Sequence, residues 1–372
     1  MQIVLSSKNS RIRQITIGMK NVNILTIHKE PNYGAVLQAY ALYKVVKLLG
    51  HNPRIINLSM EYRHFPYNMK YRTMLSLHKW IKGYSRCYGI AEAFSKRYCP
   101  NQIGNFHTLG ELESYNWDID DYYLIGSDQV WNPAITQKLS NAFCLSFLGD
   151  DALNRYAYAA SLGHIEDEAA RKAALDMASL AKFKRIAVRE QFGVEFLRHC
   201  GIAASEVLDP TLLLGNYMEL LPRKVEERDE ILFLSLSDTE PMNKFVADLS
   251  ASMELPVSKH YGYLQPRRSD NMKFMPVEEW LYAIASSRVV VTDSFHATVF
   301  AILFRRPFFV YISKPSKLAR ISNLLANLGI SGRVVGNVAD TKIAPEINYD
   351  DVASNLVAYR TDSMNYIKAI LE

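Results

Sequence analysis

One histidine stands where a strand passes directly into a helix. Residues 289–304 read VVVTDSFHATVFAILF: the valine run is typical of a buried strand, Asp293 or Ser294 is a natural N-cap, and His296 falls in the first helical turn. The partial positive charge of a helix N-terminus opposes protonation of such a histidine, and an anionic ligand restores it. His296 is therefore a candidate general acid that becomes charged when substrate binds. A histidine that merely packs against the sheet is the alternative.

Two further strand ends carry polar side chains. Arg189 ends the apolar run RIAVRE, and its planar guanidinium matches carboxylate or phosphate oxygens, although a solvated arginine is the simpler interpretation. In LIGSDQVWNP, Ser127 and Asp128 can hydrogen-bond a ligand or cap the turn that follows Gly126. Arg189 is thus a candidate anion-binding residue, and Ser127 and Asp128 are candidate substrate contacts.

Two helix starts add weaker candidates. Asn32, Tyr33 and Gly34 form a loop that opens a helix, but one glycine is not the GxGxxG fingerprint of a dinucleotide site. The segment KPSKLARIS offers side chains that could face one anion or form an ordinary solvated helix face: Lys314, Ser316, Lys317 and Arg320.

Alternating strands and helices must position these residues. Short apolar runs followed by helix-spaced segments recur from residue 21 onward, and the alternation restarts near residue 231, after a stretch with two prolines and a charge cluster. This pattern predicts an α/β fold with two Rossmann-like domains. Ligands of open α/β sheets bind beyond the carboxyl ends of the strands, so we expect one cleft to be faced by the loops of Asn32, Ser127, Arg189 and His296.

The same pattern predicts the domain boundaries. An N-terminal appendix of 1–18 precedes a first domain of 19–205, a linker covers 206–230, and the second domain covers 231–372. Residues 60–117 are rich in Tyr, Arg and Lys and show no clean strand, which indicates a helical insertion on the first domain.

Bulk composition narrows the class of protein. A chain of 372 residues exceeds what one hydrophobic core usually serves, and its net charge of +5 without an arginine-rich run does not indicate a nucleic-acid groove. The four cysteines form no CxxC pair, which argues against a zinc knuckle or a disulfide framework and favours a reducing compartment. No apolar window approaches the ~20 residues of a membrane span. We therefore expect a soluble cytoplasmic enzyme that binds a small anion.

Six segments together resemble one family. NYGAVLQAYAL, YLIGSDQVWNP, YAASLG, AVRE, VLDPTLLL and VVVTDSFHATVFAILF, in this order between about residues 21 and 330, are similar to the polysaccharide pyruvyl transferase family. The resemblance implies a fold like that of GT-B glycosyltransferases, with the ligand cleft between two Rossmann-like halves. It also implies phosphoenolpyruvate as the donor substrate, with no cofactor and no obligatory metal.

The resemblance assigns roles to individual residues. His296 corresponds to the family histidine proposed as general acid, and Arg189 matches an arginine thought to hold the anionic donor. Ser294 departs from some relatives, which carry a basic residue there, so the donor phosphate must find its positive charge elsewhere. Four residues are candidates for that charge: Arg305, Arg306, Lys317 and Arg320. Asp128 is a candidate base or acceptor-binding group.

Phosphoenolpyruvate chemistry fits a histidine acid, because protonation of its terminal carbon makes the neighbouring carbon electrophilic toward a sugar hydroxyl. By the resemblance, the acceptor is a sugar or a lipid-linked oligosaccharide on the route to a surface, capsular or exopolysaccharide. Contact with the inner membrane face would then be transient, and the basic, aromatic region 60–100 could supply it. Two alternatives stay open: a GT-B glycosyltransferase that uses a nucleotide sugar, and a non-catalytic carbohydrate-binding relative.

Overall fold

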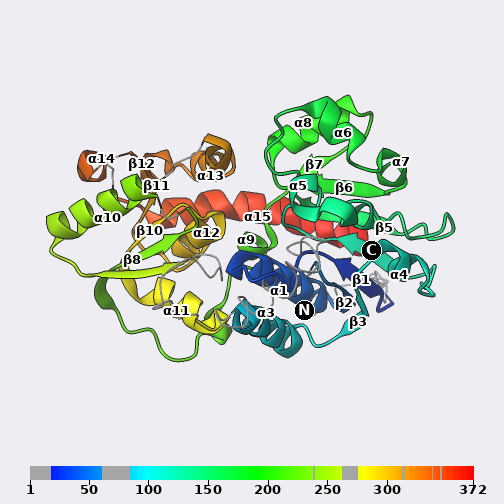
Figure 1. The fold of residues 1–372 in the computed structure, drawn as a ribbon, viewed down its shortest axis with the longest axis horizontal. Coiled ribbons are helices and arrows are strands. Elements are labelled where there is room, and N and C mark those ends of the chain that lie inside the picture. Colours follow the sequence, from blue (N-terminus) through cyan, green and yellow to red (C-terminus); the bar gives the residue numbers. More distant parts are fainter. Residues whose placement is uncertain are drawn as a thin grey trace, which may run out of the picture.

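The computed structural model describes residues 18–60, 84–237, 239–261, 275–311, 315–336, 338–343 and 346–372. Two parallel sheets form two lobes (Figure 1). The predicted appendix therefore lies outside the described residues except for Gly18, as does much of the predicted helical insertion.

The first sheet has seven parallel strands in the order β3-β2-β1-β4-β5-β6-β7. Their bounds are β1 (Asn21–Leu25), β2 (Asn52–Leu58), β3 (Gln102–Phe106), β4 (Tyr122–Ile125), β5 (Arg155–Ala160), β6 (Arg185–Val188) and β7 (Ser205–Glu206). The helices between them are α1 (Tyr33–Leu48), α3 (Tyr84–Tyr98), α4 (Leu109–Glu113), α5 (Pro133–Thr136), α6 (Glu168–Ala173), α7 (Met177–Leu180) and α8 (Gln191–His199). The crossovers direct the carboxyl ends of all seven strands to one edge.

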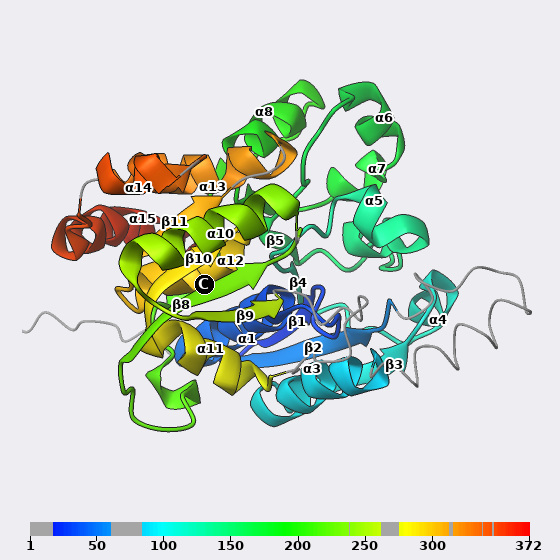
Figure 2. The same ribbon diagram turned by 60° about the vertical axis from the view of Figure 1, so that its left-hand side comes forward.

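The second sheet has five parallel strands in the order β12-β11-β10-β8-β9. They are β8 (Arg228–Ser235), β9 (Val257–Tyr261), β10 (Ser287–Thr292), β11 (Phe308–Tyr311) and β12 (Val334–Val335). The helices after the first sheet are α9 (Pro210–Leu214), α10 (Glu240–Met253), α11 (Val277–Ser286), α12 (Phe295–Leu303), α13 (Pro315–Asn327), α14 (Val338–Ile343) and α15 (Tyr349–Leu371). The turned view shows α10, α11, α12, α13 and α14 around the second sheet (Figure 2).

Helix α1 joins the two lobes. Nearly all of its side chains are buried, because it lies between the first sheet and elements of the second lobe (Figure 1). Tyr33 at its first position stacks on Trp280 of α11, with ring centroids 4.9 Å apart, and donates a hydrogen bond to the carbonyl of Met275. The continuous apolar surface of α1 is thus explained by contacts on both sides.

Three features differ from the sequence expectation. Strand β3 lies inside the region predicted to be helical, and its short, half-exposed sequence hides the period-two pattern of a strand. The predicted linker contains α9, which packs against α1. The last helix, α15, returns to the first sheet, where Tyr366 donates a hydrogen bond to Ala157 and Lys20 binds the carbonyl of Leu371. An amphipathic helix can bury its apolar side against either sheet, so local periodicity could not reveal this placement.

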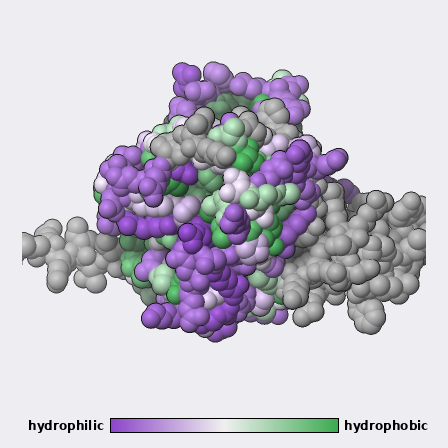
Figure 3. All heavy atoms as spheres, turned by 90° about the vertical axis from the view of Figure 1, so that its left-hand side faces the viewer, coloured by the Kyte–Doolittle hydropathy of each residue, from purple (hydrophilic) through white to green (hydrophobic). Residues whose placement is uncertain are grey.

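The end face of the second lobe is mostly hydrophilic, with small separate apolar patches (Figure 3). Across the described part of the chain, every helix is too short or too polar to cross a bilayer.

A buried histidine after β1 should make the fold sensitive to acid. Burial lowers the pKa of His28 from 6.5 to about 4, although its ring hydrogen-bonds the Thr26 carbonyl. Below pH 6.5 the unfolded chain binds a proton that the native state excludes, so the free energy of unfolding should fall by about 2–3 kcal/mol between these two pH values. Urea titrations across this range should show a shallower pH dependence for His28→Gln than for wild type. An equal slope in both proteins would contradict this assignment.

Candidate functional site

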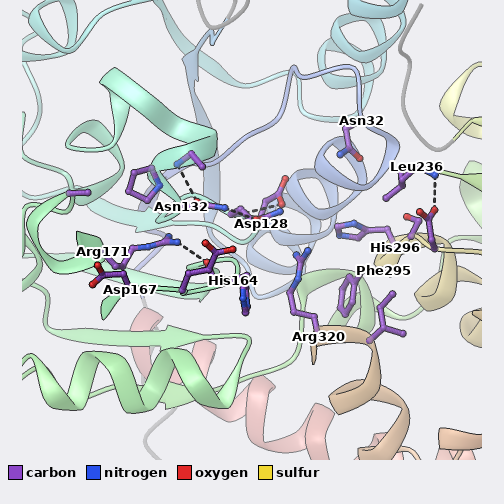
Figure 4. Close-up of a pocket in the computed structure, with 18 of the residues that line it drawn as sticks. Asn32, Asp128, Asn132, His164, Asp167, Arg171, Leu236, Phe295, His296 and Arg320 are labelled. Atoms are coloured by element: carbon purple, nitrogen blue, oxygen red, sulfur yellow. Dashed lines mark hydrogen bonds between the residues drawn. The ribbon is translucent and has the colours of Figure 1, made fainter. Parts of the chain in front are cut away.

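The larger of two cavities that border Arg320 lies between the lobes, with a volume of about 640 Å³ (Figure 4). Residues from both sides line it, among them Asn32, Asp128, Gln129, Asn132, His164, Glu166, Asp167, Arg171, Asp293, Ser294, Phe295, His296 and Arg320. Asn32 precedes α1, Asp128 follows β4, and His296 follows β10. Each therefore comes from the carboxyl end of a strand, where ligands of such sheets bind.

His296 occupies the first turn of α12. Ser294 caps the helix, its hydroxyl accepting the amide N–H of Ala297 at 3.4 Å. The histidine is 9% exposed, and its Nε2 has no hydrogen-bond partner within the described residues. Burial lowers the pKa of His296 below 6.5; Asp209 and Asp128 oppose this shift, while Arg189 and Arg320 add to it. The imidazole is thus held neutral in a wall of the cavity.

Gly34 is the residue packed against the imidazole. A Cβ atom at this position of α1 would collide with Nδ1 of His296. Asn32 accepts the amide N–H groups of Gly34 at 2.9 Å and Ala35 at 3.3 Å, which fixes the start of α1 at this place. The N-termini of α1 and α12 therefore meet at His296, where their partial positive charges favour an anion.

Replacing Gly34 with alanine should destabilise the protein. Alanine is normally the better helix former, but here its methyl group must displace the imidazole, so we expect a loss of about 1–3 kcal/mol in the free energy of unfolding. Gly89→Ala in α3 is the matched control, because an added Cβ meets nothing within 4 Å there. Chemical denaturation of both variants measures the difference. Equal stability changes would show that the Gly34 contact is unimportant.

A buried ion cluster lies behind His296. Arg189 donates from Nη1 to Oδ2 of Asp209 at 3.0 Å and from Nε to Oε1 of Glu190 at 3.1 Å, and its Nη2 lies 3.9 Å from Oδ1 of Asp128. Its side chain is 3% exposed and stacks on Phe295, 5.2 Å from the ring centroid. Three carboxylates surround this one guanidinium, and they raise its pKa although burial lowers it. Arg189 is therefore fixed by the protein itself.

Asp209 connects this cluster to the histidine. Its Oδ2 lies 3.8 Å from Nε2 of His296, and its Oδ1 accepts the backbone N–H of Thr211 at 2.9 Å and its hydroxyl at 2.6 Å. Ser127 donates to Oδ2 at 2.9 Å, so the predicted Ser127 contact is to Asp209 and not to the cavity. Burial raises the pKa of Asp209, but the contact with His296, the charge of Arg189 and the Thr211 hydrogen bonds outweigh burial and keep this pKa low.

Asp209 was not among the residues that the sequence singled out. Its Asp-Pro-Thr context is a helix-start signal, and Asp209 does cap α9. The signal predicts a cap only. The contact with His296 arises from tertiary packing.

Asp128 holds an unusual backbone conformation at the cavity. Its φ is 72°, in the left-handed region that aspartate tolerates better than most residues. Its Oδ1 accepts the N–H of Gln129 at 2.9 Å, and its carbonyl accepts the N–H of Ser161 at 2.9 Å. These bonds direct a partly exposed carboxylate into the cavity.

The basic candidates are separated by the fold. Arg320 reaches from α13 toward Asp128 and His296 and borders both the larger cavity and a second one of about 420 Å³ (Figure 4). Arg305 and Arg306 follow the opposite end of α12, where they pair with Asp350 at 2.8 Å and Glu227 at 3.4 Å, so they cannot supply the charge beside His296. Lys317 lies on α13, but its side chain is outside the described part of the structure, as is Lys314. Of the described residues, none forms a group of three or more His, Cys, Asp or Glu suited to a metal ion.

Several solved structures share this architecture. The chain resembles Methanocaldococcus jannaschii UDP-GlcNAc 2-epimerase in complex with UDP-GlcNAc and UDP, with a TM-score of 0.52, 12% identity, and coverage of 89% of this chain and 94% of the epimerase. The S. aureus MnaA–UDP structure matches with a TM-score of 0.53 and 11% identity, and the match covers 91% of this chain and 90% of that one. A structure titled putative UDP-N-acetylglucosamine 2-epimerase, from Listeria monocytogenes, matches with a TM-score of 0.50 and 10% identity, covering 93% of this chain and 89% of that one. At these identities the likeness shows the fold alone, which is GT-B-like with a cleft between the two lobes.

The sequence itself carries the family relationship. No curated protein matches the chain. The family model described as polysaccharide pyruvyl transferase, however, matches residues 32–315, which span the helix start at Asn32, the Asp128 loop, the Arg189–Asp209 cluster and His296. The match covers most of the chain and all of these cleft elements, so the protein belongs to the polysaccharide pyruvyl transferase family and is a transferase.

Proposed function

We propose that this protein moves the pyruvyl group of phosphoenolpyruvate onto two hydroxyls of a sugar, with His296 as the general acid. The family implies a pyruvyl donor and a polysaccharide acceptor. The observation that carries the proposal is the position of His296. It lines the cleft beside Arg320 at the N-terminus of α12, and its buried Nε2 has no hydrogen-bond partner among the described residues. No other described histidine combines these three properties.

The reaction requires one proton donor and releases phosphate. His296 gives a proton to the terminal carbon of phosphoenolpyruvate, which becomes a methyl group, and the neighbouring carbon becomes an oxocarbenium-like centre. One sugar hydroxyl adds there, the phosphate leaves, and a second hydroxyl closes the ketal. The two hydroxyl protons restore His296 and leave with phosphate, so the products are the ketal and inorganic phosphate. General acids of this kind contribute about 10²–10⁴-fold.

The donor itself would switch His296 on. Without ligand, burial keeps the imidazole neutral. A phosphate and a carboxylate placed beside it would favour the imidazolium and raise its pKa, with Asp209 supporting the charge from 3.8 Å. Protonation would therefore accompany donor binding.

We assign the donor's anionic groups to Arg320 and to the N–H groups at the starts of α12 and α1. The resemblance gives this role to Arg189, whose charge is already shared among three carboxylates in the structure. We therefore propose that Arg189 acts by holding Asp209 in place. Asp128 faces the same cavity and is suited to accept a proton from, or hydrogen-bond to, an acceptor hydroxyl.

The test is incubation with phosphoenolpyruvate and candidate glycans, followed by assay of inorganic phosphate and mass spectrometry of the glycan. We expect phosphate release together with a pyruvate ketal on the glycan. Transfer from a nucleotide sugar instead would identify a GT-B glycosyltransferase. Glycan binding without turnover of either donor would identify a carbohydrate-binding relative. We place the product on the route to a surface polysaccharide, by family analogy alone.

A further inference from the structure

The larger cavity has two chemically different walls (Figure 4). On the second-lobe side are Ser294, Phe295, His296 and Arg320, the residues assigned above to the donor. On the first-lobe side are Gln129, Asn132, His164, Glu166, Asp167 and Arg171. Asp128 lies between the two groups (Figure 4). A volume of about 640 Å³ is larger than a donor as small as phosphoenolpyruvate requires, so the first-lobe wall has room for a second substrate.

The first-lobe wall is acidic. Glu166 and Asp167 line it, and Asp128 lines the same cavity. The three carboxylates outnumber Arg171, whose guanidinium is oriented by hydrogen bonds to backbone carbonyls, from Nη1 to Trp131 at 2.9 Å and to Leu162, and from Nη2 to His164 at 2.9 Å. An anionic group placed here would meet an excess of negative charge.

The rest of this wall suits a sugar. The Gln129 and Asn132 side chains are joined by a hydrogen bond of 2.8 Å, and amides of this kind offer both donors and acceptors to hydroxyl groups. Between the polar side chains lie small apolar residues against which the C–H face of a sugar ring can pack: Pro133, Ala134, Ala170 and Ala174. Asp167 is held by its N-cap bond to Ala170 N at 3.0 Å, so its position is preformed.

We infer that the first-lobe wall binds the acceptor sugar and selects an uncharged sugar unit over a uronic acid. The inference rests on the proposed function in one respect: that function identifies the second substrate as an acceptor sugar. Its physical basis is independent of the donor: the wall pairs hydroxyl-binding groups with unbalanced negative charge, which disfavours a carboxylate on the ligand. The neutral hydroxyls that become the ketal would then face His296 from the side of Asp128.

Binding should be measured without phosphoenolpyruvate, so that the result does not depend on the transfer reaction. Saturation-transfer NMR with methyl glucoside, galactoside and mannoside, set against methyl glucuronide and galacturonide, compares the two classes directly. We expect at least one neutral glycoside to bind at least about tenfold more tightly than its uronate partner. The double variant Glu166→Gln, Asp167→Asn keeps the hydrogen-bonding geometry, including an N-cap, and should narrow that ratio by raising uronate affinity.

Tyr359→Ala supplies the control, because Tyr359 lines the second cavity of about 420 Å³ and not the larger one. It should leave the glycoside preference unchanged. The inference is overturned if uronates bind as well as neutral glycosides, if no glycoside of either class binds, or if Tyr359→Ala weakens binding more than the double variant changes it. If phosphoenolpyruvate did not react but neutral glycosides still bound more tightly than uronates, the proposed function would be rejected. The inference that the first-lobe wall binds a neutral sugar would still hold.

Discussion

Replacing His296 with glutamine should lower the turnover of phosphoenolpyruvate by at least about 100-fold, because a general acid acts in the transition state. Donor affinity should change much less, since Arg320 and the two helix N-termini remain. Glutamine keeps a polar group near the contact with Gly34 but cannot deliver a proton. Steady-state phosphate release and a separate titration of donor binding measure the two effects independently.

His199→Gln is the matched control for this experiment. His199 ends α8, pairs with Glu168 at 3.3 Å on the surface and lines neither cavity. Its replacement should leave turnover unaffected. If the His296 variant kept wild-type turnover, or lost only thermal stability, His296 would be a packing residue and the proposed acid would have to be sought elsewhere.

Removing the Asp209 carboxylate should produce the largest loss of stability. In Asp209→Ala, the buried guanidinium of Arg189 loses one of its two hydrogen-bonded carboxylates, and Thr211 loses the acceptor for two donors. Deleting one partner of a buried ion pair typically costs about 3–5 kcal/mol. Arg189 keeps Glu190 and Asp128 in this variant, but Ser127 also loses its buried acceptor. The free energy of unfolding from urea titration gives the value.

Asp229→Ala tests whether burial is the reason. Asp229 also pairs with an arginine, Arg288, at 2.6 Å, but both side chains are more than half exposed. Exposed pairs contribute at most about 1 kcal/mol, so this variant should lie close to wild type. Similar losses of stability in both variants would mean that burial does not make the Arg189–Asp209 pair more important than an exposed pair.

An Asp209→Asn variant that folds should in addition show an altered acid limb in its pH–rate profile, since His296 loses the charge that supports its imidazolium.

This member of the polysaccharide pyruvyl transferase family has a GT-B-like fold that proteins outside the family share. Solved structures with 12% identity or less, among them a UDP-GlcNAc 2-epimerase, share this fold. The difference in function must therefore lie in the side chains that the loops bring into the cleft. In this chain the cleft is lined by the neutral imidazole of His296, by Arg320 from α13 and by an acidic first-lobe wall.

Local sequence determined the position of His296 in its helix and the alternation of strands and helices. Capping by Ser294 or Asn32 and the periodicity of apolar residues depend on neighbours a few positions away, so they can be predicted without the fold. The same holds for the carboxyl-end location of Asn32, Asp128, Arg189 and His296, because parallel sheets direct all those ends to one edge.

Tertiary structure alone decided which of these residues meet. Asp209, 87 positions before His296, contacts it because α9 and α12 pack on each other and on the same helix, α1. Gly34 looked like part of a weak loop motif, and its role is to leave room for an imidazole from the other lobe. Arg189 matched an anion-binding role by type, but three carboxylates from separate loops already surround it. Such contacts depend on how whole elements pack, and a residue's type and near neighbours carry no record of that packing.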